Sequence, residues 1–139
     1  MIFVKSEPTR EFLEYCFKQD QDLLDKFHIY SGQGVKACAE KTYLDLLQAN
    51  VVFYKMYDCN DNLLGWFGKE SDNHLTGFFI EPQYRKEVKL NKVLEQFSKP
   101  VYTGLYLKNT RAIKAMNKLG FQIIKTITTP DGVGVLMEL

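Results

Sequence analysis

The segment from Asn109 to Phe121 constrains the fold of this chain most strongly, because it reads as a short amphipathic helix between two apolar strands. Its apolar residues recur at helical spacing and share one face: Ala112, Ala115, Met116 and Leu119. Asn109 is a good N-cap, since its side chain can accept a hydrogen bond from the free amides of the first turn. Gly120 can adopt the left-handed conformation that ends a helix. The segment is therefore predicted to be a helical crossover between two strands.

Length and composition limit the class of protein. The chain has 139 residues and a formal net charge of +1, and it is 45% hydrophobic and 25% charged. This length predicts a single domain, 1–139, that can bury a substantial core. A net charge near zero gives no general attraction to nucleic acid or to an anionic membrane. No apolar run approaches the roughly 20 residues that cross a bilayer, so neither a nucleic-acid partner nor a membrane span is expected.

The cysteines indicate neither disulfide bonds nor a metal site. Cys16, Cys38 and Cys59 are odd in number and far apart in the chain. The sequence has no CxxC pair and no Cys/His cluster, so we predict neither a disulfide framework nor a metal site. Reduced thiols, together with an N-terminus that is too polar for a signal peptide, predict a cytoplasmic protein.

Apolar periodicity predicts the order of elements along the chain. The predicted strands are 2–5, 51–58, 63–69, 75–80, 101–107, 121–127 and 133–139. The predicted helices are 12–17 with a further turn at 23–27, 35–50, 90–97 and 109–120. This order describes a β-meander followed by two helical crossovers. It predicts an α/β (α+β) fold in which a mixed, mostly antiparallel central sheet is flanked by helices.

A second motif follows the predicted central strand and reads Ile80-Glu81-Pro82-Gln83-Tyr84-Arg85. Together with the segment 109–121 and the order of elements, it resembles the GCN5-related N-acetyltransferase (GNAT) family. The resemblance implies the family fold over the whole chain. It also implies the family reaction, the transfer of an acetyl group from acetyl-CoA to an amine. The acceptor would be a small-molecule or protein amine, whose identity the sequence does not specify.

The same resemblance places the cofactor. In the family, the strand around Ile80 pairs through its backbone with the pantetheine arm, and the following turn wraps the pyrophosphate. The implied cofactor-binding residues are Ile80, Arg85, Lys86, Val88, Lys89, Leu90 and Asn109. Asn109 matches an asparagine that contacts the cofactor in the family, and plain helix capping is the alternative role. Basic side chains and the dipole at the start of the predicted helix 90–97 favour a bound anion.

Two departures from the family pattern concern the cofactor turn and the proton donor. The family has glycines where this chain has Val88 and Leu90, and glycine there lets backbone amides approach the phosphates. Many members carry a tyrosine that protonates the leaving thiolate at the place of Met116, and methionine cannot donate a proton. Both departures weaken the expectation of ordinary family activity.

Few side chains are candidates for the proton transfers. Glu81 ends the central strand and is the candidate base, acting directly or through water, with a solvated strand-end carboxylate as the alternative. Tyr106 lies late on the strand 101–107 and is the candidate acid, with a core aromatic as the alternative.

Two functions are therefore compatible with the sequence. The first is a divergent acetyl-CoA-dependent N-acetyltransferase. The second is a catalytically inactive binding or accessory protein on the same fold, as some phage-encoded proteins are, which has lost the cofactor loop. A third option is an unrelated α+β binding domain in which the resemblance is coincidence. The family fold requires the strands 75–80 and 101–107 to splay apart, so the structure tests it directly.

Overall fold

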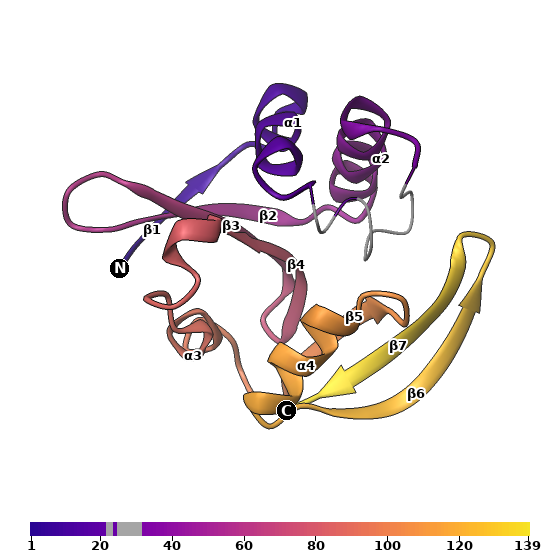
Figure 1. Ribbon diagram of the computed structural model, residues 1–139. Helices are drawn as coiled ribbons and strands as arrows, with labels where there is room; N and C mark the ends of the chain where they lie inside the picture. The colour runs from indigo at the N-terminus through magenta and orange to yellow at the C-terminus, as the bar shows by residue number, and fades with distance from the viewer. Residues whose placement is uncertain (22–23, 25–31) are drawn as a thin grey trace.

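The computed structural model describes residues 1–21, 24 and 32–139 (Figure 1). The strands are β1 (Ile2–Ser6), β2 (Val52–Tyr57), β3 (Leu63–Ser71), β4 (His74–Ile80), β5 (Tyr102–Tyr106), β6 (Gln122–Thr129) and β7 (Gly132–Glu138). The helices are α1 (Arg10–Gln19), α2 (Val35–Gln48), α3 (Leu90–Leu94) and α4 (Thr110–Lys118), with a 3₁₀ turn, η2 (Pro82–Tyr84). This succession confirms the predicted order of elements. The helical turn predicted at 23–27 lies, apart from Leu24, outside the described residues.

The strands form one sheet in the order β1-β2-β3-β4-β5-β7-β6. Neighbouring strands are antiparallel except for β4 and β5, which are parallel. The predicted mixed, mostly antiparallel sheet is therefore confirmed. β4 lies in the middle of the sheet, as its apolar residues on both faces predict.

β4 and β5 separate soon after they begin. Their only pairs among the described residues are His74 with Tyr102 and Leu75 with Thr103. At this last point of contact, the Thr103 hydroxyl donates a 2.9 Å hydrogen bond to the Leu75 carbonyl oxygen. The two strands then part, which is the splay that the family fold requires.

Helices cover both faces of the sheet, and each face has its own core. Figure 1 shows α1 and α2 together on one side of the sheet, and α3 and α4 lie on the other. The core beneath α1 and α2 includes Leu13, Cys38, Phe53, Trp66 and Phe79. The core beneath α3 and α4 includes Met56, Phe67, Val93, Met116 and Phe121. The described helices include none that is long and apolar enough to cross a membrane.

Gly65 allows β3 to approach the end of β4 closely. A Cβ at Gly65 would lie 1.9 Å from the Phe79 carbonyl oxygen, so a side chain has no room there. The register of β2 against β3 shifts beside it, between Met56 and Tyr57. A register shift of this kind is typical of a β-bulge, which a glycine within a strand often accompanies. Gly65 pairs with Ile80, so the close approach positions the last residue of β4.

The helix predicted at 90–97 is shorter in the structure, which corrects one argument for anion binding. α3 ends at Leu94, and the amides of Gln96 and Phe97 donate to carbonyls three residues earlier, at 3.0 and 3.1 Å. Turns of this kind keep Phe97 in the core without extending the α-helix. A five-residue helix has a small dipole, so the dipole contributes little to anion binding at this turn.

Candidate functional site

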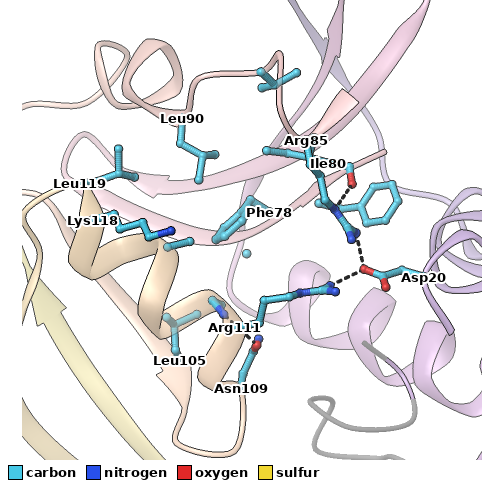
Figure 2. Close-up of a pocket in the computed structure, with 15 residues that line it drawn as sticks. Asp20, Phe78, Ile80, Arg85, Leu90, Leu105, Asn109, Arg111, Lys118 and Leu119 are labelled. Carbon is cyan, nitrogen blue, oxygen red and sulfur yellow. Dashed lines mark hydrogen bonds and ion pairs between the residues drawn. The ribbon is translucent and has the colours of Figure 1, made fainter. Parts of the chain in front are cut away.

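A cavity of about 430 Å³ lies where β4 and β5 part (Figure 2). Five of the seven predicted cofactor-binding residues line it: Ile80, Arg85, Val88, Leu90 and Asn109. The other two, Lys86 and Lys89, are exposed and do not belong to its lining. The structure therefore brings most of the predicted residues to one cavity, although the chain separates Asn109 from the rest.

The wall of the cavity is largely apolar. Phe78 of β4, Leu105 of β5 and Leu119 after α4 face one another across it (Figure 2). Small residues of α4, Ala112 and Ala115, complete this wall and leave the space open. A long ligand with an uncharged middle would fit such a wall.

α4 has the predicted cap and apolar face. Oδ1 of Asn109 accepts a 3.2 Å hydrogen bond from the Ala112 amide, which confirms the N-cap. Met116 is fully buried in the core beneath the helix and does not line the cavity. The position that carries a proton donor in many family members is therefore filled by a buried, non-ionisable side chain.

Three charged residues meet at the side of the cavity next to α1 (Figure 2). Asp20, directly after α1, is 4% exposed and forms ion pairs with Arg85 and, at 2.6 Å, with Nη2 of Arg111. Nε of Arg85 also donates a 3.1 Å hydrogen bond to the Ile80 carbonyl oxygen. This cluster ties α1 to the loop after β4 and to the start of α4.

The loop after β4 differs from a glycine-rich phosphate turn. The amides of Glu87 and Val88 both donate to the Tyr84 carbonyl oxygen, at 3.0 and 2.9 Å. The side chains of Val88 and Leu90 are half-buried, pack against the core beneath α3 and line the cavity. These side chains occupy space that glycines would leave open, and two of the amides bond within the loop.

Glu81 is buried, with 2% of its surface exposed, which excludes a solvated strand-end carboxylate. Its Oε1 accepts a 2.6 Å hydrogen bond from the hydroxyl of Tyr15 on α1. Its Oε2 has no hydrogen-bond partner among the described residues. Side chains alternate along a strand, so Ile80 lines the cavity whereas Glu81 points toward α1.

Two groups beside Glu81, the Tyr15 hydroxyl and the Cys16 thiol, keep their protons. The hydrogen bond to Glu81, with burial as a second cause, raises the pKa of Tyr15 to about 12. Burial raises the pKa of the Cys16 thiol to about 12, and the Glu81 carboxylate acts in the same direction. Both groups are therefore neutral at pH 7, and Cys16 is a poor nucleophile.

Tyr106 accepts a 2.9 Å hydrogen bond from the Asn109 amide through its carbonyl oxygen, but it does not line the cavity of the predicted cofactor residues. It lines a second cavity of about 260 Å³ with neighbours that include Gly104, Ile127 and Val135. Burial raises the pKa of Tyr106, so its phenol is a weaker acid than an exposed tyrosine. Among the described residues, no group of His, Cys, Asp and Glu side chains is arranged to hold a metal ion.

Sequence reasoning missed Asp20, Arg111 and Tyr15. Asp20 lies 65 residues from Arg85 and 91 from Arg111, so no local pattern joins them. Tyr15 lies 66 residues from Glu81 on a helix with an ordinary amphipathic pattern. The only sign of Asp20 in the sequence was that it interrupts the apolar pattern just after α1.

No protein-family model matches the chain, and no curated protein matches it in sequence. Solved structures do match it. A GCN5-related N-acetyltransferase from Rhodopseudomonas palustris is 14% identical, with a TM-score of 0.63, over 97% of this chain and 96% of that one. AAC(6')-Ib in complex with ribostamycin and coenzyme A is 17% identical, with a TM-score of 0.60, over 99% and 93%. Spermidine N-acetyltransferase from Vibrio cholerae in complex with CoA and spermine is 14% identical, with a TM-score of 0.60, over 99% and 94%.

At these identities the likeness shows the fold. The splayed pair β4 and β5, the helices on both faces and the full-length match agree with one another. The chain therefore has the fold of the GCN5-related N-acetyltransferases, on a sequence that diverges widely from these solved structures.

Proposed function

We propose that this protein binds acetyl-CoA in the cavity between β4 and β5 and transfers the acetyl group to an amine. The observation that carries the proposal is the cavity of about 430 Å³ at the splay, which five of the predicted cofactor-binding residues line. Its apolar wall suits the pantetheine arm. The presence of CoA in the complexes of AAC(6')-Ib and spermidine N-acetyltransferase supports the proposal.

Side chains, more than backbone amides, hold the phosphates in this proposal. The amides of Glu87 and Val88 already donate to Tyr84. Arg85 and Lys118 line the cavity, and Figure 2 shows Lys118 extending from α4 toward it. Charge-assisted hydrogen bonds from such cations are strong, but the long, exposed side chain of Lys118 loses conformational entropy when it binds. We expect weaker binding than a glycine turn gives, with a marked dependence on salt.

Arg85 changes partner when the cofactor binds. Its Nε holds the Ile80 carbonyl, which lies where the family resemblance places pairing with pantetheine. In this proposal a pantetheine amide donates to this carbonyl oxygen in place of Arg85. The freed guanidinium then faces the cavity with the charge that a phosphate needs. Because the same guanidinium also pairs with Asp20, cofactor binding and this ion pair are coupled.

Catalysis in this proposal depends mainly on holding the thioester against the amine. Glu81 follows directly on Ile80 at the end of β4 and is the proposed base. The rate would rest on positioning and on this base, because Met116 cannot protonate the leaving thiolate.

A non-catalytic binding domain is the second candidate function. Two observations favour it. The side chains of Val88 and Leu90 fill the turn that glycines leave open in the family. Met116 is fully buried where many members keep a proton donor. This candidate predicts either no acetyl-CoA binding or binding without transfer.

Chromatography of the reaction mixture separates the two candidates. The protein is incubated with acetyl-CoA and, in separate reactions, a polyamine, an aminoglycoside and a peptide with a free amine. Free CoA is measured by absorbance after separation, because the exposed Cys59 would react with a thiol reagent. CoA release that depends on one of the amines supports the enzyme. Acetyl-CoA binding without release above the amine-free control supports the binding domain.

A further inference from the structure

We infer that Tyr15 is a catalytic residue that carries a proton from the acceptor amine to the buried carboxylate of Glu81. The inference rests on the proposed acetyl transfer and names the group through which Glu81 acts. Neither the family resemblance nor the sequence pattern pointed to Tyr15.

Glu81 needs an intermediary because it is buried. With 2% of its surface exposed, its carboxylate is shielded from direct contact with an amine. A buried carboxylate oxygen without a hydrogen bond is costly, and the Oε2 atom of Glu81 has no partner among the described residues. A purely structural carboxylate would be expected to have both oxygens bonded. The unpartnered Oε2 shows that the hydrogen bonds of the fold do not occupy the whole carboxylate, which therefore keeps the capacity to accept a proton at Oε1.

Tyr15 connects this carboxylate with the surface beside α1. Its hydroxyl donates to Oε1 of Glu81 at 2.6 Å, and 41% of the residue is exposed. The cavity reaches the same region, because Ile80, next to Glu81, and Asp20, just beyond α1, both line it. Tyr15 does not itself line the cavity, so in this inference the amine approaches its hydroxyl from the exposed surface beside α1, next to the end of the cavity at Ile80 and Asp20.

The proton transfer balances without any further reactant. The amine nitrogen forms the C–N bond and gives a proton to the Tyr15 oxygen, while Tyr15 gives its own proton to Oε1 of Glu81. The C–S bond then breaks, and CoA leaves as the thiolate. The proton on Glu81 returns through the same hydroxyl to the thiolate or to water. Tyr15 is a neutral phenol before and after each step.

The groups around the pair are compatible with this path. Cys16 on α1 and Tyr84 in η2 both raise the pKa of Tyr15, so neither stabilises a tyrosinate. Lys55 on β2 and the Trp66 indole on β3 act on the Cys16 thiol beside the pair. With its pKa near 12, Tyr15 keeps its proton at pH 7 and can pass it on only as it receives another.

Matched variants test the relay. Tyr15→Phe removes the hydroxyl, and Glu81→Gln removes the proton acceptor but keeps an oxygen to accept the Tyr15 hydrogen bond. We expect each to lower kcat roughly 100-fold, the smaller end of what a general base contributes. The double variant should lose no more than either single one, because the two residues act as a unit. The dissociation constant of acetyl-CoA, measured by calorimetry, should not change. Tyr43→Phe on α2 is the control.

The solvent isotope effect on kcat gives a readout that a structural role would not produce. Two protons move together in the relay, so the rate of the wild-type protein should fall non-linearly with the deuterium fraction. It should fall linearly or not at all in Tyr15→Phe. If the wild-type protein transfers the acetyl group and Tyr15→Phe is equally active, the relay is wrong but the acetyltransferase proposal stands. A wild-type protein that binds no acetyl-CoA, or binds it without transfer, would overturn the acetyltransferase proposal and the relay with it.

Discussion

The hydroxyl of Tyr15 donates a 2.6 Å hydrogen bond to Oε1 of Glu81, and this bond ties α1 to the end of β4 beside the cavity. The cavity, the splay of β4 from β5 and the Asp20 cluster meet in the same region. The bond therefore contributes to the stability of the fold and, in our proposal, to the chemistry. These contributions can be measured separately.

The first prediction concerns stability at alkaline pH. The hydrogen bond to Glu81 raises the pKa of Tyr15 from 10 to about 12. A group whose pKa is raised by folding stabilises the fold below its unfolded pKa, and this contribution is lost as the pH rises through the folded value. The wild-type advantage over Tyr15→Phe should be about 1 kcal/mol at pH 7, because Tyr15 is 41% exposed and solvent screens the interaction. It should shrink between pH 10 and 12.

Urea denaturation of both proteins at stepped pH gives this difference. Burial also raises the pKa of Cys16, but this residue is present in both proteins, so its effect largely cancels. A difference that stays constant from pH 7 to pH 12 would show that the bond does not hold the Tyr15 proton.

The second prediction concerns Asp20, whose carboxylate is almost fully buried between Arg85 and Arg111. Asp20→Asn removes the buried carboxylate that two half-buried guanidinium groups share. The free energy of unfolding should fall by about 2–4 kcal/mol, below the full cost of breaking a wholly buried pair. Glu40→Gln is the matched control, because the Arg10–Glu40 pair is exposed and its loss should matter much less. Equal losses in the two variants would contradict a structural role for the cluster.

The third prediction compares two strand glycines. A Cβ at Gly65 would lie 1.9 Å from the Phe79 carbonyl oxygen, whereas a Cβ at Gly104 would have nothing within 4 Å. Gly65→Ala should therefore cost about 3 kcal/mol or more, because the backbone of β4 has to move. Gly104→Ala should be nearly neutral. Thermal unfolding of both variants measures the contrast, and a mild effect at Gly65 would argue against the close approach of β3 to β4.

The fourth prediction concerns the loop that replaces the glycine turn. Val88→Gly removes a side chain from the cavity wall and gives the backbone more freedom near the phosphates. Its affinity for acetyl-CoA should rise by about tenfold, which corresponds to about 1.4 kcal/mol. Lys89→Gly provides the same backbone freedom at a residue outside the lining, and we expect it to weaken binding. If the two variants bind alike in calorimetry, the Val88 side chain does not limit the cofactor.

Much of the fold was predictable because its signals are local. Asn109, the apolar face of α4 and Gly120 lie within one short segment, and the structure shows the cap and the buried face as predicted. Strand periodicity and the turn between β2 and β3 likewise depend on neighbouring residues. Local order of this kind, read along the chain, was enough to predict the mixed sheet, whereas the splay was expected from the family resemblance.

The parts of the site that were missed depend on distant residues. Asp20 and Tyr15 acquire their roles only when α1 packs against the end of β4, and their partners lie at least 65 residues away. The end of α3 was misplaced for a different reason. Apolar residues three or four apart fit both an α-helix and successive tighter turns, so spacing alone could not show that the helix stops at Leu94.

Calorimetry with acetyl-CoA tests the central claim most directly, in the wild-type protein and in two variants of α4. Ala112→Phe places a large ring in the cavity wall, and Lys114→Phe places the same ring on the exposed face of the same helix. We expect saturable heat below millimolar acetyl-CoA for the wild type and for Lys114→Phe, and loss of this heat in Ala112→Phe. No heat from the wild type at millimolar acetyl-CoA, or equal binding by Ala112→Phe, would contradict this expectation.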